Sequence, residues 1–81
     1  MGLNNSKPSL RDCNDDLYSK SMYMVNGGAE KIRTHDLNGS LEEYEKQFRK
    51  CLKLYCKEMI YYQIESFKDS IKLIENYKNL K

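Results

Sequence analysis

The side chains that could do covalent or metal chemistry are few in this 81-residue chain, which has three cysteines and one histidine. Cys13, Cys51 and Cys56 could supply a nucleophile if His35 acted as its base. The same four side chains could also be proposed as zinc ligands. Their spacing favours neither role, because one cysteine and the histidine lie far from the C-x4-C pair. We therefore expect no catalytic site and no metal site here.

The acidic run of residues 12–17, DCNDDL, begins with acids and amides spaced as in a calcium-binding loop. Leu17 stands at the sixth position of that pattern, where the loop needs glycine for its turn. Tyr23 stands at the twelfth, where a bidentate glutamate belongs. Gly27 and Gly28 also lack the further residues of a phosphate-binding loop. We therefore predict a protein that is not an enzyme and uses no metal or cofactor.

The number of cysteines is odd, so they cannot all form disulfides within one chain. Cys51 and Cys56 are five residues apart, which on a helix places them on separated faces. No secretory signal is recognisable at the N-terminus. We therefore expect reduced thiols and an intracellular, reducing compartment.

The N-terminal residues MGLNNSK match the N-myristoylation pattern M-G-x-x-x-[ST], with Gly2 as the acceptor. Residues 1–8 are polar and are predicted to form a flexible arm. A single myristoyl chain gives only marginal membrane binding. An acylated Gly2 would therefore need a second contact, and a protein partner already at the membrane is the one we favour.

Length and composition indicate one small domain over residues 9–81, because a chain this short supports only a small core. The formal net charge is +2, too low to indicate nucleic-acid binding by itself. The longest apolar run, Met59–Tyr62, is far shorter than the roughly 20 residues of a membrane-spanning helix.

A first helix is predicted at about residues 9–26, where apolar and small side chains recur at helical spacing. Ser9 could cap this helix, with Asp12 three residues later, or Asn14 could cap a shorter version. The Asn-Gly-Gly sequence at 26–28 favours its end. Residues 27–39 are expected to form a connection, with room for a helical turn at 29–33.

A long amphipathic helix is predicted at residues 40–79. Ser40 and Glu43 form a capping-box pattern at its start, and no glycine or proline follows. One uninterrupted helix of roughly 38 residues would be about 57 Å long. A break near residues 65–70 is the alternative, because Ser66, Asp69 and Ser70 are weaker helix formers.

The apolar residues of this segment follow two stripes, one ending near Tyr62 and one beginning at Ile60. On a single helix the stripes lie roughly 100–120° apart, which a regular coiled coil would not show. The helix could bend near residue 66, pack on the first helix and on a separate partner, or be surrounded by a partner. We expect a protein partner to complete this helix by covering Tyr44, Phe48, Leu52, Tyr55, Met59, Ile60, Tyr62, Ile64, Phe67, Ile71 and Ile74.

Basic residues lie on the side of the helix opposite the first stripe, at Lys46, Arg49, Lys50, Lys53 and Lys57. The simplest interpretation is a solvated face. As a binding surface, it would suit an acidic protein or an anionic membrane better than nucleic acid.

Together these patterns predict an all-α protein with a short N-terminal helix, a glycine-containing connection and one long amphipathic C-terminal helix, arranged as a helical hairpin or as an extended two-helix subunit. The leading hypothesis is a non-enzymatic adaptor or accessory subunit of a membrane-associated assembly, at the cytoplasmic face of a membrane and N-myristoylated at Gly2. The alternative is a constitutive small subunit of a large organellar complex, such as one of the mitochondrial inner membrane or intermembrane space. A nucleic-acid-binding helix is a third, weaker hypothesis.

Overall fold

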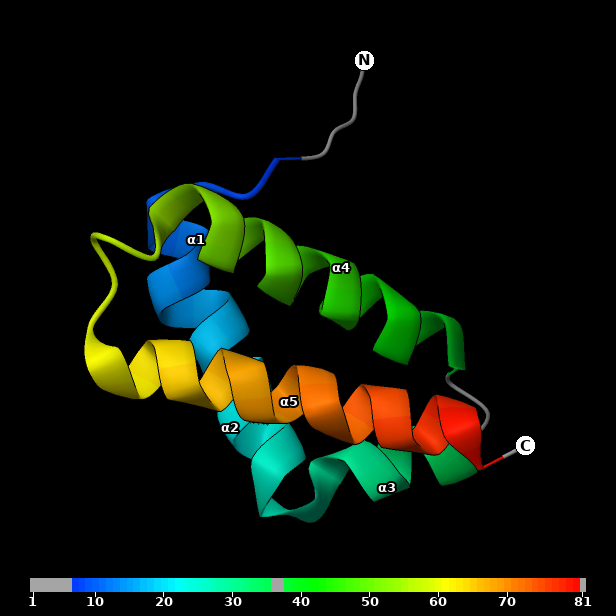
Figure 1. Cartoon of the computed structure of the whole chain (residues 1–81). Coiled ribbons are helices and arrows are strands. Elements are labelled where there is room, and N and C mark those ends of the chain that lie inside the picture. Colours follow the sequence, from blue (N-terminus) through cyan, green and yellow to red (C-terminus); the bar gives the residue numbers. More distant parts are fainter. Residues whose placement is uncertain (1–6, 36–37, 81) are drawn as a thin grey trace.

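The computed structural model describes residues 7–35 and 38–80, and of Asn38 the backbone only. These residues form an all-α fold, as predicted, in which a bent N-terminal helical segment packs across a hairpin of two antiparallel helices (Figure 1). The N-terminal segment is a long helix rather than the short one expected. Gly2 and the rest of residues 1–6 lie outside the described residues.

The N-terminal segment begins with α1 (Leu10–Asp12), passes through the π-helical η1 (Cys13–Leu17) and continues as α2 (Tyr18–Tyr23). Ser9 caps its start: the Asp12 amide donates to Ser9 Oγ at 3.1 Å, and the Ser9 amide donates to Asp12 Oδ2 at 3.3 Å. These reciprocal bonds satisfy two amides that lack a partner inside the helix. Of the two predicted starts, Ser9 is confirmed and Asn14 is wrong.

The chain bends within η2 (Met24–Gly28) and resumes as α3 (Ala29–Thr34). Gly27 has φ of 103°, a conformation in which a side chain would be strained. The predicted stop at Asn26–Gly28 is therefore confirmed, and the helical turn expected soon after it is α3. Ala29 is buried and holds this short helix against the core.

The single helix predicted over residues 40–79 is wrong. The chain forms α4 (Asn38–Tyr55) and α5 (Tyr61–Asn79), joined by residues 56–60. The break falls before residues 65–70, which are helical. The helix also begins at Asn38, so Ser40 lies inside the first turn instead of capping it. The reversal between α4 and α5 turns both apolar stripes toward one core (Figure 1).

The core lies where α4 and α5 face the N-terminal segment. The rings of Phe48 on α4 and Phe67 on α5 stack with centroids 5.1 Å apart, and both side chains are fully buried. Each such side chain contributes roughly 1.5–3 kcal/mol by leaving water. The buried apolar side chains around them are Cys13, Leu17, Met24, Ala29, Leu41, Cys51, Met59, Ile71 and Ile74.

Small hydroxyl residues form the contact between α2 and α5. Ser21 Oγ and Ser66 Oγ lie 2.8 Å apart, and Ser70 Oγ donates to the Ser21 carbonyl at 3.3 Å and, within its own helix, to the Ser66 carbonyl at 2.9 Å. All three side chains are buried, and hydrogen bonding offsets the cost of removing their hydroxyls from water. Ser66 and Ser70, which suggested a helix break, instead pack α5 against α2.

A disulfide joins Cys13 of η1 to Cys51 of α4, whose Cα atoms are 5.9 Å apart. Both residues are fully buried, whereas Cys56 is an exposed free thiol. The expectation that all thiols are reduced is wrong for this pair. The packing of the N-terminal segment on α4 brings the two cysteines together, and their spacing in the sequence gave no sign of it.

Removing the disulfide is predicted to destabilise the fold strongly. It closes a loop of 38 residues, for which the loss of unfolded-state entropy corresponds to about 4 kcal/mol. Urea denaturation should show this loss in Cys13→Ala/Cys51→Ala, and a similar loss in the wild-type protein after reduction. Cys56→Ser is the matched control and should keep the wild-type midpoint; an equal loss there would contradict the prediction.

Candidate functional site

Most of the apolar side chains expected to contact a partner are covered by the chain itself. Five of the eleven lie in the core: Phe48, Met59, Phe67, Ile71 and Ile74. Four more are partly buried against it: Tyr44, Leu52, Tyr55 and Ile64. Because the core covers these nine side chains, their apolar character no longer requires a partner along the whole of residues 40–79. Ile60 and Tyr62 remain exposed.

The predicted basic face separates into two groups. Arg49 pairs with Glu45 on α4 and with Glu75 on α5, so its charge is neutralised by carboxylates of the same chain. Lys46, Lys50, Lys53 and Lys57 are exposed. Within the described part of the chain, no ion pair involves Lys46, Lys53 or Lys57. The four exposed lysines are therefore the part of the basic face that is accessible to another molecule.

The ion-pair network between α4 and α5 is centred on Glu45, whose side chain is 10% exposed. Its carboxylate accepts from Arg49 Nη2 at 2.9 Å and from Lys78 Nζ at 2.8 Å. Burial favours the neutral acid, but the hydrogen bonds from Lys78 and Arg49 outweigh burial and lower the pKa of Glu45. The network therefore joins the hairpin's helices and is structural.

Glu45→Gln is predicted to destabilise the protein at neutral pH by about 1–2 kcal/mol, because Arg49 and Lys78 lose a charged acceptor but stay partly solvated. The lowered pKa means that the carboxylate stabilises the fold above its unfolded-state pKa near 4.5. This contribution is lost as the pH falls through the lower folded-state value.

Urea midpoints measured from pH 7 to pH 3 should therefore show a difference between wild type and Glu45→Gln that shrinks below about pH 4.5. Glu43→Gln is the matched control, because the exposed Glu43 bonds only Gln47 among the described residues. A constant difference down to pH 3 would contradict the assignment to Glu45.

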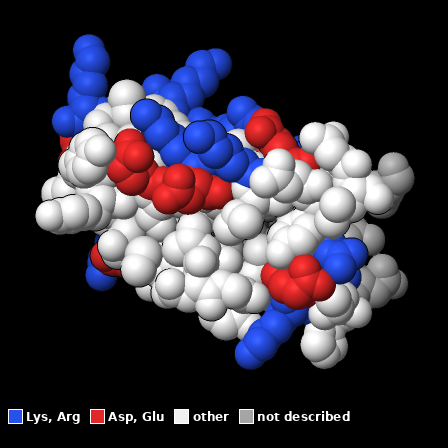
Figure 2. Space-filling model, turned by 60° about the horizontal axis from the view of Figure 1, so that its bottom comes forward, with Lys and Arg blue, Asp and Glu red and all other residues white. Residues whose placement is uncertain are grey.

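An exposed apolar tip stands where α4 turns into α5. We define it by Leu54, Ile60, Tyr61 and Tyr62, whose exposed fractions are 39%, 60%, 69% and 73%. The Tyr61 and Tyr62 rings contact each other edge to face, with centroids 6.2 Å apart. White side chains form the outermost left-hand edge of the surface in Figure 2, the end at which Figure 1 places the connection, and charged side chains lie above and below them. Lys53, just before Leu54, and Lys57, between Leu54 and Ile60, are exposed.

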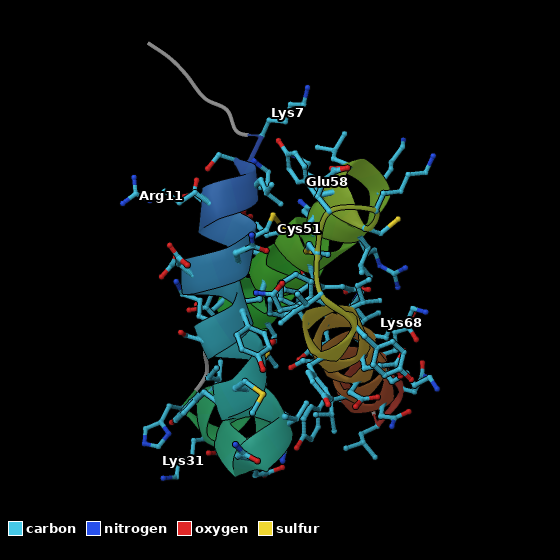
Figure 3. The ribbon with its side chains drawn as sticks, turned by 90° about the vertical axis from the view of Figure 1, so that its left-hand side faces the viewer. Lys7, Arg11, Lys31, Cys51, Glu58 and Lys68 are labelled. Carbon is cyan, nitrogen blue, oxygen red and sulfur yellow. A yellow bond between two sulfur atoms is a disulfide. The ribbon has the colours of Figure 1, made fainter. Side chains whose placement is uncertain are left out.

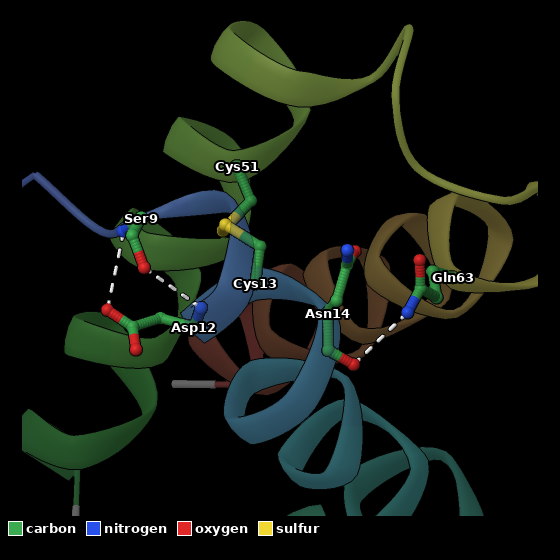
Figure 4. Close-up of a disulfide and its surroundings, with 6 residues drawn as sticks. All are labelled: Ser9, Asp12, Cys13, Asn14, Cys51 and Gln63. Carbon is green, nitrogen blue, oxygen red and sulfur yellow. Dashed lines mark hydrogen bonds between the residues drawn. A yellow bond between two sulfur atoms is a disulfide. The ribbon is translucent and has the colours of Figure 1, made fainter.

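The N-terminal arm joins the fold at this same end. Figure 1 shows the start of α1 beside the end of α4, and Figure 3, viewed from that side, shows Lys7 at the top of the molecule and Lys31 at the bottom. Two tertiary contacts fix this arrangement (Figure 4): the Cys13–Cys51 disulfide, and a 3.1 Å hydrogen bond from Gln63 Nε2 to the Asn14 carbonyl. The start of the N-terminal segment, the end of α4 and the start of α5 are therefore held together beneath the tip.

The opposite end of the fold has an open hollow of about 190 Å³ between α3, α4 and α5, where Arg33 and Tyr77 lie together. The Arg33 guanidinium pairs with Glu30 at 2.8 Å and lies over the Tyr77 ring. The pKa of Glu30 is lowered, first by its hydrogen bond with Arg33 and then by one with Tyr77. The charges of Arg33 and Glu30 therefore neutralise each other beside the hollow.

The expected absence of catalytic and metal-binding residues is not tested by any of these contacts. His35 is exposed, and its Nδ1 lies 2.8 Å from the Lys31 carbonyl. In residues 7–35 and 38–80, no group of three or more His, Cys, Asp or Glu side chains is placed to hold a metal ion. None of the helices described is long and apolar enough to cross a membrane.

No protein-family model, curated protein sequence or solved structure matches this chain. The candidate site is therefore the end of the fold that combines the apolar tip, the exposed lysines and the point where the N-terminal arm begins.

Proposed function

We propose that this protein is a non-enzymatic helical adaptor of a membrane-associated protein assembly, acylated at Gly2. One observation carries the proposal: the helical segment that follows the arm with the acylation pattern starts beside the end of α4 and the start of α5, at the end that also exposes the apolar tip. An acyl chain on this arm and a contact through the tip can therefore act on the same side of the molecule.

Burial of the two apolar stripes changes where a partner would bind. Because Phe48 and Phe67 stack within the chain, the faces of α4 and α5 that carry them are already occupied. Of the residues predicted to contact a partner or an acidic surface, those that remain exposed, apart from the ion-paired Arg49, are Ile60, Tyr62, Lys46, Lys50, Lys53 and Lys57. A compact contact of this size suits an adaptor that gains strength from a lipid, since one myristoyl chain alone holds a protein only marginally.

Acylation is tested by the mass of the protein made in a eukaryotic host. For the wild type we expect removal of Met1, the added mass of a myristoyl group on Gly2, and recovery in the membrane fraction. For Gly2→Ala we expect no acylation and no recovery in the membrane fraction. Lys31→Gln, remote from the arm, should behave as the wild type. A wild-type mass with Met1 retained would overturn the acylation.

The disulfide favours a second candidate, a small constitutive subunit of a complex in an oxidising compartment such as the mitochondrial intermembrane space. Disulfides persist in oxidising compartments and are rare in the cytosol. The buried Cys13–Cys51 bond is therefore expected more readily there than at the cytoplasmic face of a membrane.

The two candidates differ in thiol state and in the size of the native particle. Alkylation of thiols in intact cells, followed by mass analysis, should find Cys13 and Cys51 oxidised and Cys56 free if the subunit hypothesis holds. Size-exclusion of native extract should then give one fixed high-mass peak. Reduced Cys13 and Cys51, with a distribution that changes with salt or lipid, would favour the adaptor.

A further inference from the structure

We propose that the apolar tip, together with Lys53 and Lys57, is a docking surface for an anionic lipid bilayer. This proposal deepens the proposed function, because it names a lipid surface as what the apolar tip binds. It rests on the proposed function for one point, that the end of the fold with the tip faces the membrane. It does not depend on Gly2 being acylated.

Ile60 is the clearest sign that the tip is not built for stability alone. It occupies the N-cap position of α5, with φ of −74° and ψ of 157°, and its exposed fraction is 60%. Serine, threonine, aspartate or asparagine is preferred at this position, because a side-chain oxygen there accepts from the free amides of the first turn. An isoleucine provides no acceptor and leaves apolar surface in water, so its presence costs stability both locally and by exposure.

The two tyrosines that follow have the chemistry of a membrane interface. Tyr61 and Tyr62 expose about seven-tenths of their surface, and their rings are apolar with a polar hydroxyl at one end. Tyrosine is enriched where acyl chains meet headgroups for this reason. Leu54, on the last turn of α4, adds aliphatic surface to the same end.

The charges around the tip complement an anionic surface. Lys53 and Lys57 are exposed, and no ion pair within the described residues involves them. Long lysine stems can lie along an apolar surface while the ammonium reaches the headgroups. Glu58 is the one acid between Lys53 and Tyr62.

The shape favours a bilayer over a groove-binding protein or a second copy of this chain. The connection between α4 and α5 lies at the outermost end of the hairpin (Figure 1), and the side chains of the tip are exposed there. A projecting turn can enter the headgroup layer without a complementary cavity, whereas a stable protein interface needs a broad matched surface. Aromatic and aliphatic residues at the apex with lysines beside them are the pattern of an interfacial anchor.

The test uses the full chain produced in bacteria, without a myristoyl group, and vesicles of phosphatidylcholine with or without phosphatidylserine. We expect co-sedimentation with the anionic vesicles, weakening as salt is raised, and little binding to neutral ones. Lys53→Gln/Lys57→Gln should lower the partition coefficient about 30-fold. Lys31→Gln/Lys72→Gln removes the same charge from exposed positions outside the tip and should keep the wild-type value.

Ile60→Ser supplies a readout that a merely structural role would not give. It should raise the urea midpoint by improving the cap of α5, and at the same time lower binding to anionic vesicles. Ile60→Ser/Tyr62→Ser should lower the partition coefficient about tenfold or more. Opposite changes in stability and binding support the docking surface.

Four results would overturn the inference: no binding of the wild type, equal loss in both lysine pairs, vesicle binding that is unchanged in Ile60→Ser/Tyr62→Ser, or a dimer in light scattering that Ile60→Ser dissolves. The last would assign the tip to a second copy of the chain. Because the bacterial protein lacks the lipid, these results are separate from the mass measurement on Gly2, and either proposal can fail while the other stands.

Discussion

The chain reversal between Tyr55 and Tyr61 is the constraint on which the rest of the structure depends. It makes α5 antiparallel to α4, so that Phe67 meets Phe48 in one core. In a continuous helix, Phe67, Ile71 and Ile74 would face water, at roughly 1.5–3 kcal/mol each. Ending α4 costs a few backbone hydrogen bonds of about 1 kcal/mol each, and bonds to the Tyr55 carbonyl from Glu58 and Met59 recover part of that. Burial therefore outweighs helix continuity.

The contacts that stabilise this reversal are concentrated beneath it. Cys51, near the end of α4, is bonded to Cys13, and Gln63, in the first turn of α5, donates to the Asn14 carbonyl. Met59 is buried under the turn itself. In the far part of the hairpin, Glu45 pairs with Arg49 and Lys78, and the side chains of Arg49 and Lys78 are about half exposed. The exposed side chains of the apolar tip thus stand on the part of the fold that the disulfide joins covalently, which holds them in place without covering them.

Local signals in the sequence predicted part of the local structure. The capping-box pattern of Ser40 and Glu43 did not mark a helix start, because α4 begins at Asn38. The Ser9 cap and the stop at Asn26–Gly28 depend on neighbouring residues, and both are present. The reversal could not be found in this way, because residues 56–60 contain neither glycine nor proline and the turn is selected by tertiary burial. The shift between the apolar stripes was its only trace, and three explanations fitted that shift equally. The Cys13–Cys51 pair has a separation of 38 residues, so it too depends on the packing of helices.

At the candidate site too, the sequence predicted which side chains are apolar but not which of them the fold would bury. Apolar type marks a side chain that is costly to expose, but the tertiary fold decides what covers it. For Phe48 and Phe67 the cover is the chain itself, whereas Ile60 and Tyr62 remain in water. Ile60 adds a second cost, because it stands where a polar cap would stabilise α5. Two costs at one residue, on a turn held firmly from below, are what a fold shows where binding rather than stability determines the side chain. The apolar tip is therefore a better guide to function in this chain than the longer stripes that its own core explains.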